Sequence, residues 1–249
     1  MIDFLKRITV EAGELIERTE RTKAKDKGVA GWATEADFAS EEFLMSQIHK
    51  QFPSHKILSE ETENTLEDLE KEPHLWVIDP VDGTTNFSFH IPFYCISAGY
   101  MENGKTIAGA VYDPSRNELF WAEDGKGAFM NTTRLTIDQQ TSFKGKVACV
   151  GFWHPNKKDF RVTQKIYKQG AANIVSHGSA ALSLSYIAAG RLFLFYQSTP
   201  LHAWDVAAAQ LVIEEAGGKF FYEGSYFSPH NIIAGNQWGV DQTKHILHI

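Results

Sequence analysis

The chain has 249 residues, of which 43% are hydrophobic and 22% are charged, and its formal net charge is −7. This composition excludes a disordered or low-complexity chain and predicts a folded protein with a large buried core. The acidic balance argues against a nucleic-acid-binding protein, and no apolar run approaches the roughly 20 residues of a membrane-spanning helix, so we expect no membrane contact.

The cysteines and the N-terminus bear on the cellular compartment. Cys95 and Cys149 are the only cysteines, and both stand among apolar residues, which favours two free thiols over a disulfide. The first seven residues carry charges within their apolar stretch and lack a small-residue cleavage site, unlike a signal peptide. The sequence therefore predicts a cytoplasmic protein.

Two amphipathic helices are predicted first. In the first helix, apolar residues recur at steps of three and four, at Leu5, Ile8, Ala12, Leu15 and Ile16. A second helix begins near Asp37 and stops before Pro53, and its apolar stripe comprises Phe38, Phe43, Leu44 and Ile48. We expect the two helices to pack together over a sheet.

The pattern then becomes typical of β-strands. Strand candidates lie at residues 76–78, 94–100, 107–112 and 118–122, and the turns between them include Asn103-Gly104 and Asp113-Pro114. Such short connections predict an antiparallel meander. After about residue 140, strand candidates at 147–150, 173–175, 192–196 and 232–234 alternate with helix candidates at 159–168, 180–189 and 206–216.

The most informative segment spans residues 76–87, in which an apolar strand runs into Asp-Pro-Val-Asp-Gly-Thr-Thr. Pro80 fixes one backbone torsion of the turn and Gly83 permits an unusual one, so Asp79 and Asp82 are brought to the same place. Two carboxylates aimed at one spot repel each other unless they hold a hard cation such as magnesium.

Neighbouring groups could complete such a site. The carbonyl of Val81 offers another oxygen, and Gly83, Thr84 and Thr85 offer backbone N–H groups and hydroxyls to a phosphate. The alternative is an Asp-Pro turn in which an aspartate merely caps a helix.

Segment 76–87 resembles the signature of the inositol monophosphatase family, within the lithium-sensitive, magnesium-dependent phosphatases. Four further segments are similar to family motifs in the family's order: Thr34 to Asp37, the Glu60-Glu61 step, Gly178-Ser179, and Trp204-Asp205. Read alone, each segment has a simpler explanation. Thr34 to Asp37 could be a helix start, Glu60-Glu61 a solvated loop, and Ser179 and Asp205 could each cap a helix.

The resemblance and the predicted elements together imply an α/β (α+β) fold, a layered αβαβα sandwich. Its N-terminal half, residues 1–140, would contain an antiparallel sheet and most metal ligands. The C-terminal half, residues 141–249, would be mixed α/β and carry Asp205. We expect the two halves to pack tightly as one functional unit, and the resemblance also implies a homodimer.

By the same resemblance, the site binds two or three Mg²⁺ ions, with Mn²⁺ as a possible substitute and Li⁺ as an inhibitor. The implied metal ligands are Glu60, Asp79, the Val81 carbonyl, Asp82 and Asp205. The implied catalytic residues are Glu60, Thr84 and Asp37, which would orient an attacking water. The implied substrate-binding residues are Asp82, Gly83, Thr84, Gly178, Ser179 and Asp205.

Two departures from the family pattern concern the substrate and a third metal. Inositol-selective relatives carry a glutamate seven residues before the Trp-Asp aspartate, where this chain has Ser198. We therefore expect a roomier pocket walled by Gln197, Ser198 and His202, although His202 could equally be a packing residue. The second departure lies in the lysine-rich segment that contains Lys23, Lys25 and Lys27. Gly31 stands there where the family has an aspartate, and this position bears on the third metal.

The preferred hypothesis is hydrolysis of inositol monophosphate. Other candidate substrates are fructose 1,6-bisphosphate, adenosine 3′,5′-bisphosphate, NADP and histidinol phosphate, and broad specificity is also possible. A regulatory role as a partner of RNA polymerase or the ribosome is the alternative from a different class.

Overall fold

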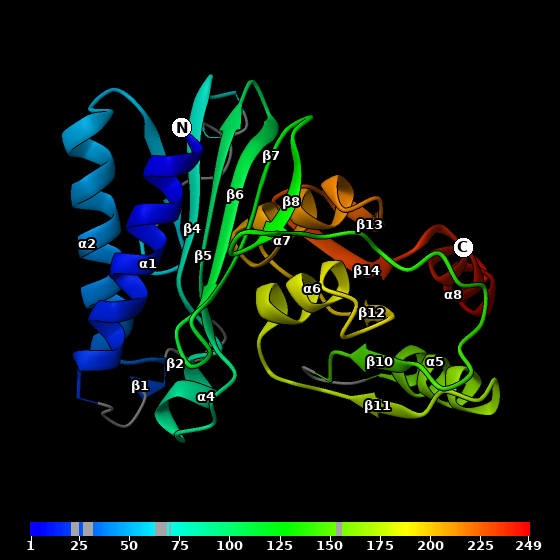
Figure 1. Cartoon of the computed structure of the whole chain (residues 1–249). Coiled ribbons are helices and arrows are strands. Elements are labelled where there is room, and N and C mark those ends of the chain that lie inside the picture. The colour runs from blue at the N-terminus through cyan, green and yellow to red at the C-terminus, as the bar shows by residue number, and fades with distance from the viewer. Residues whose placement is uncertain (21–24, 27–31, 63–68, 70, 153–155) are drawn as a thin grey trace.

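The computed structural model describes residues 1–20, 25–26, 32–62, 69, 71–152 and 156–249. These residues form five layers in the order helices, sheet, helices, sheet, helices (Figure 1). The layered αβαβα sandwich is therefore confirmed. The division into halves at residue 140 stays a prediction.

The first helical layer consists of α1 (Ile2–Arg18) and α2 (Glu35–Gln51), which pack against each other and against the first sheet. That sheet has the order β3-β4-β5-β6-β7-β8-β9. Its strands are β3 (Lys56–Ser59), β4 (His74–Asp82), β5 (Cys95–Glu102), β6 (Lys105–Asp113), β7 (Glu118–Glu123), β8 (Gly127–Met130) and β9 (Thr133–Arg134). From β4 onward every pairing is antiparallel, which confirms the predicted meander, and β3 pairs with β4 in parallel. A separate pair is formed by β1 (Lys25–Asp26) and β2 (Trp32–Ala33).

One prediction about α2 is wrong. Phe38 was assigned to its apolar stripe, yet Phe38 is 49% exposed, whereas Leu44 and Ile48 are fully buried. The buried face of the first turns is polar instead, because Asp37 and Ser40 turn inward, and Ser40 Oγ donates a hydrogen bond to the Pro80 carbonyl at 2.9 Å. The start of α2 is thus aligned by contacts to the Asp-Pro turn rather than by an apolar stripe.

The middle layer contains α6 (Ala180–Ala188) and α7 (Ala203–Glu215), which lie between the two sheets (Figure 1). Helix α7 approaches the first sheet closely because β6 has a glycine at the contact: a Cβ on Gly109 would lie 2.8 Å from the Cα of Ala208. The short helix α4 (Thr84–Ser88) follows β4 directly. These packings fix the starts of α4, α6 and α7 relative to the end of β4.

The second sheet has the order β11-β10-β12-β14-β13. Its strands are β10 (Val147–Val150), β11 (Asn173–Val175), β12 (Leu194–Gln197), β13 (Lys219–Ser225) and β14 (Ser228–Gly235). The sheet is mixed, with parallel pairs on both sides of β10 and antiparallel pairs on both sides of β14. The outer helices are α5 (Lys157–Lys168) and α8 (Gln237–Leu247). The sequence did not predict β8, β9, β13 or α8.

Two further predictions concern the whole chain. Cys95 and Cys149 are both buried and unpaired, as expected. Within the described ranges, every helix is too short or too polar to cross a bilayer.

Candidate active site

A pocket of about 360 Å³ lies where the end of β4 meets the first turns of α4, α6 and α7 and the end of β12. It brings together predicted residues from distant parts of the sequence. These are Glu60, Asp79, Val81, Asp82, Gly83, Thr84, Gly178, Ser179, Gln197, His202 and Asp205. The sequence motifs therefore meet at a single site.

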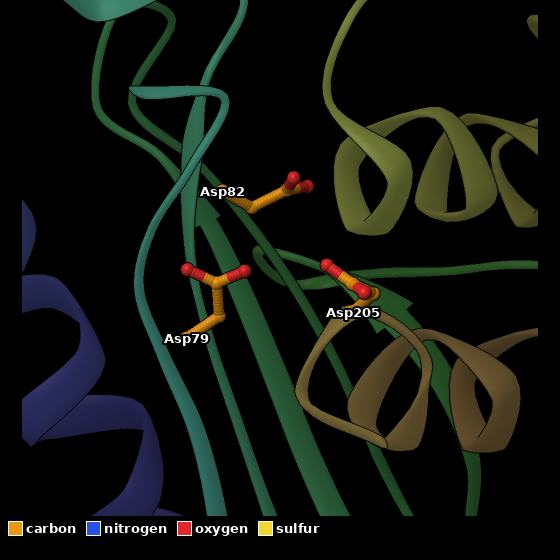
Figure 2. Close-up of side chains that lie close together, drawn as sticks. All are labelled: Asp79, Asp82 and Asp205. Atoms are coloured by element: carbon orange, nitrogen blue, oxygen red, sulfur yellow. The ribbon is translucent and has the colours of Figure 1, made fainter. Parts of the chain in front are cut away.

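Three carboxylates form the centre of this site. Asp79 and Asp82 come from the end of β4 and Asp205 from the first turn of α7, and Figure 2 shows their side chains lying around a common space. One oxygen of each carboxylate lies within 4.8 Å of the others. Asp79 is 1% exposed and Asp82 is 7% exposed, so both charges lie in a region that water reaches poorly.

The turn that carries the two β4 carboxylates is built by a local irregularity. The pairing with β5 shifts register between Asp79 and Asp82. The next residue, Gly83, has a φ of 97°, and a Cβ there would lie 3.1 Å from the Phe93 carbonyl oxygen and 3.2 Å from Ser179 Cβ. A glycine is required at this position because both the conformation and the space exclude a side chain.

Asp82 also receives hydrogen bonds from the start of α6. Its carboxylate accepts hydrogen bonds from Ser179 Oγ at 2.6 Å, Ala181 N at 2.7 Å and Ala180 N at 3.2 Å. Ser179 occupies the N-cap position but makes no capping bond of its own. The helix is therefore capped by Asp82 from another element, which holds that carboxylate in a fixed orientation.

Asp205 occupies the third position of a capping box, since its Oδ2 accepts a hydrogen bond from the backbone N–H of His202 at 2.7 Å. The simpler explanation from the sequence, an aspartate at the N-cap, is thus wrong in position, because His202 is the N-cap and Asp205 supports it from the third helical position. A carboxylate has two oxygens, so capping through one of them is compatible with metal binding through the other.

Asp37 lies behind the pocket and reaches it through Thr84. Asp37 Oδ2 accepts hydrogen bonds from Thr34 N at 2.7 Å and from Thr34 Oγ1 at 2.6 Å, as in a capping box. Its Oδ1 accepts a hydrogen bond from Thr84 Oγ1 at 2.7 Å. The Thr84 hydroxyl also lies 3.0 Å from the Val81 carbonyl oxygen. Asp37 is fully buried, and its hydrogen bond with Thr84 connects it to the pocket lining.

The electrostatics of the carboxylates favour a bound cation. Burial and then the charges of Glu60, Asp82, Asp205 and Asp37 raise the pKa of Asp79 well above its ordinary value. Burial also raises the pKa of Asp205 and of Asp82, although for Asp82 the hydrogen bonds from Ser179 and the start of α6 oppose the rise. Such a site takes up protons unless a cation offsets its charge, and hard oxygen donors in this number fit magnesium.

A sequence model of the inositol monophosphatase family matches residues 1–247. The chain belongs to the inositol monophosphatase family. Nus factor SuhB of Haemophilus influenzae is 36% identical over 245 residues, which cover 94% of this chain and 90% of that protein. Inositol monophosphatase 3 of Solanum lycopersicum is 36% identical over 230 residues, or 88% of this chain and 85% of that protein.

The fold comparison agrees with the sequence comparison. The solved structure of an IMPase from Thermotoga maritima superposes with a TM-score of 0.87 at 30% identity and covers 99% of this chain and 96% of its own. The resemblance stated from the motifs is therefore confirmed at the level of family and fold. The roles of individual residues stay predictions.

Some predicted residues of this family member lie elsewhere. Ser198 does not line the pocket; its Oγ accepts a hydrogen bond from Asn156 Nδ2 at 2.7 Å, on the side of α5. His202 lines the pocket but is exposed, and its ring stacks on Trp204 at 4.4 Å. Lys23, Lys27 and Gly31 lie outside the described residues, and Lys25 is described only as part of β1.

Sequence reasoning did not identify several lining residues, among them Gly151, Phe152 and His177. They lie in loops and at element ends that carry no periodic signal. Asn86 shows how they are positioned: its Nδ2 donates hydrogen bonds to the carbonyls of Phe93 and His177, both at 2.7 Å. This contact ties α4 to the loop before α6.

Proposed function

We propose that this protein is a magnesium-dependent phosphatase that hydrolyses a small phosphate monoester, with inositol monophosphate as the leading candidate. The observation that carries the proposal is the convergence of Asp79, Asp82 and Asp205 in one pocket of a chain that belongs to the inositol monophosphatase family. We expect two or three Mg²⁺ ions, Mn²⁺ as a substitute and Li⁺ as an inhibitor.

The metal ligands would be the carboxylates of Glu60, Asp79, Asp82 and Asp205 and the carbonyl of Val81, all of which line the pocket. When bound, the magnesium ions would offset the charge of the phosphate and lower the pKa of a water molecule. The chain itself supplies rigidity, because Asp82 is held by α6 and Asp205 by its capping contact to His202. Rigid, preorganised charges are the main source of acceleration in phosphoryl transfer.

Thr84 and Asp37 would orient the attacking water. A hydroxyl group has one hydrogen, and that of Thr84 is within hydrogen-bonding distance of Asp37 Oδ1. With its hydrogen directed there, the Thr84 oxygen remains an acceptor for a hydrogen bond from water in the pocket. Asp37 is itself fixed by the two hydrogen bonds from Thr34, which leaves it in place to accept a proton through Thr84. Glu60 would position the same water from the metal side.

The test is phosphate release by the purified protein, with and without magnesium and lithium. The substrates are inositol 1-phosphate, fructose 1,6-bisphosphate, adenosine 3′,5′-bisphosphate, NADP and histidinol phosphate. We expect magnesium-dependent release that lithium inhibits and that is fastest with inositol 1-phosphate. Absence of magnesium-dependent release from every substrate would overturn the proposal.

A second candidate function is a regulatory binding role with RNA polymerase or the ribosome. One observation favours this role: several relatives that are 36% identical to this chain are named Nus factor SuhB. The test is a pull-down with Asp82→Asn, which should abolish turnover while preserving the fold. Partner capture by this inactive variant would separate the two functions.

Two expectations accompany the proposed function. We expect a homodimer, which sedimentation of the purified protein would test. We also expect the protein in the cytoplasm, where buried free thiols such as Cys95 and Cys149 stay reduced. Fractionation of cells would test this location.

A further inference from the structure

The wall of the pocket contributed by the second sheet differs in chemistry from the carboxylate centre. It consists of the end of β10 with the residues that follow, and the end of β12, and it is largely apolar, with Cys149, Phe152 and Phe195 among its lining residues. Its polar member from β12 is Gln197. If a phosphate is held by the carboxylate centre and its cations, this wall is available to the rest of the substrate.

The Gln197 side chain lies in the wall of the pocket. Gln197 is 5% exposed and lines the pocket. Its side-chain amide makes no hydrogen bond to any other residue that the structure describes. A carboxamide can donate two hydrogen bonds and accept two, so this amide can offer both donors and an acceptor to a ligand in the pocket. The amide is therefore poised to bind a group that enters the pocket.

The alternation of β12 explains why Gln197 reaches the pocket and Ser198 does not. Successive side chains of a strand point to opposite faces. Phe195 and Gln197 both line the pocket, whereas Ser198 contacts Asn156 at the start of α5. Of the three residues predicted for the wall, Gln197 and His202 therefore line the pocket and Ser198 does not.

A glycine opposite makes room for this side chain. A Cβ built on Gly151 would lie 2.1 Å from Gln197 Oε1, so any larger residue at position 151 would displace the amide. The position of the Gln197 amide thus depends on the residue that follows β10.

Charge and size restrict what the wall can bind. None of the lining residues in the described part of the chain is a lysine or an arginine, so the described lining offers no cationic side chain to a second phosphate. The described residues of the wall formed by β10 and β12 also include no carboxylate to pair with an ammonium group. The pocket volume of about 360 Å³ is at the lower end of the roughly 300–1,000 Å³ of small-molecule sites, which disfavours a dinucleotide.

We infer that Gln197 is a specificity-determining residue that hydrogen-bonds a hydroxyl group of the substrate's alcohol part. The pocket accordingly selects monophosphates of uncharged, hydroxyl-bearing alcohols over bisphosphates and amino-alcohol phosphates. This inference rests on the proposed phosphatase function and narrows its substrate class.

The test compares kcat/KM of wild-type protein, Gln197→Leu and Gln197→Glu on three substrates. Inositol 1-phosphate has neutral hydroxyls, phenyl phosphate has none, and histidinol phosphate carries an ammonium group. We expect Gln197→Leu to lower kcat/KM roughly tenfold on inositol 1-phosphate, chiefly through KM, and to leave phenyl phosphate within about twofold. Gln197→Glu should shift the preference toward histidinol phosphate, because it places a charge where the ammonium would lie.

Three controls separate recognition from a structural effect. Gln164→Leu makes the same change at an exposed position of α5 and should match wild type. Gly151→Ala displaces the Gln197 amide without removing it and should reproduce the loss on inositol 1-phosphate. Inorganic phosphate with magnesium should raise the Tm of Gln197→Leu as much as that of wild type, because the phosphate side of the pocket is intact.

The outcomes distinguish this inference from the proposed function. An active wild type whose ratio of kcat/KM between inositol 1-phosphate and phenyl phosphate is unchanged in Gln197→Leu would overturn the inference alone. Faster hydrolysis of fructose 1,6-bisphosphate than of inositol 1-phosphate by wild type would also overturn it. A wild type without magnesium-dependent release from any substrate would overturn both.

Discussion

Replacing Asp79 by asparagine should have opposite effects on stability with and without magnesium. Asp79 is 1% exposed, and the charges of Glu60, Asp82 and Asp205 repel its own. Asparagine is nearly the same size and can keep the hydrogen bond that Asp79 Oδ1 accepts from Val81 N at 3.1 Å. In EDTA, Asp79→Asn should therefore be more stable than wild type, since a buried, repelled charge is gone.

The pH dependence of that difference has a definite sign. The pKa of Asp79 in the folded protein lies above its ordinary value of 3.8, so between these two values the folded state binds more protons than the unfolded state. In EDTA the stability of wild type should fall as the pH rises through this window and remain low above it. The stability of Asp79→Asn should fall less over the same window.

Magnesium should reverse the order. At a concentration a hundred times its Kd, a ligand stabilises the folded state by about 2.7 kcal/mol. For a chain of this size each kcal/mol raises Tm by roughly 2–4 °C, so wild type should gain roughly 5–10 °C on addition of magnesium. Asp79→Asn should gain little, and its kcat/KM should be at least roughly a hundredfold lower.

The assay is thermal unfolding in EDTA and in saturating magnesium, followed by phosphate release under the same conditions. Asp3→Asn is the matched control, because the Asp3 side chain is 93% exposed on α1. A normal magnesium-induced rise in Tm together with wild-type turnover in Asp79→Asn would refute the assignment of Asp79 as a metal ligand. A variant less stable than wild type in EDTA would refute the electrostatic reasoning.

Three further changes test other parts of the structure. Thr84→Val removes the hydroxyl that contacts Asp37 and should lower kcat by roughly 10²–10⁴. The KM and the magnesium-induced rise in Tm should stay as in wild type. Steady-state kinetics that find kcat within a few-fold of wild type would contradict this role of Thr84. Arg191→Met removes the partner that lowers the pKa of Glu118, so denaturant titration should find a loss of about 1 kcal/mol at neutral pH. That loss should disappear as the pH falls below the ordinary value of 4.5 and through the lowered pKa, and a loss that persists in acid would point to packing instead. Gly109→Ala forces a Cβ against the backbone of α7 and should lower the free energy of unfolding by about 1–3 kcal/mol in a denaturant titration. An unchanged midpoint would mean that α7 can move away from β6.

Much of the fold could be predicted because it depends on local patterns. The apolar stripe of α1 and the short turns of the meander each depend on residues that are close together in the sequence. The predicted stripe residues Leu5, Ile8, Ala12 and Ile16 are all fully buried. Strand β13 was missed because it is only half-buried and lacks a strict alternation of buried and exposed residues. Helix α8 does pack through one apolar face, and its period was overlooked near the end of the sequence. Their place is decided by contacts with β14, which lies next to both.

The carboxylate centre could be predicted in part for the same reason. Asp79 and Asp82 lie on one turn, so their convergence follows from a single segment. The contribution of Asp205 needed the family resemblance, since the sequence alone favoured a helix cap. In the structure Asp205 bonds the backbone of the N-cap residue His202 and also lies near the other two carboxylates, so a capping contact and a place in the carboxylate centre are compatible.

The wall of the pocket shows where counting along the sequence fails. Counting back seven residues from Asp205 reaches Ser198, but the count does not say toward which side of the strand that side chain points. In this protein β12 ends at Gln197, and its alternation turns residue 197 toward the pocket and residue 198 toward Asn156. Because one residue of displacement exchanges the two faces of a strand, residue type at a counted position cannot by itself assign specificity. The polar group that meets the substrate has to be found from which side chains line the pocket, and on β12 this identifies Gln197.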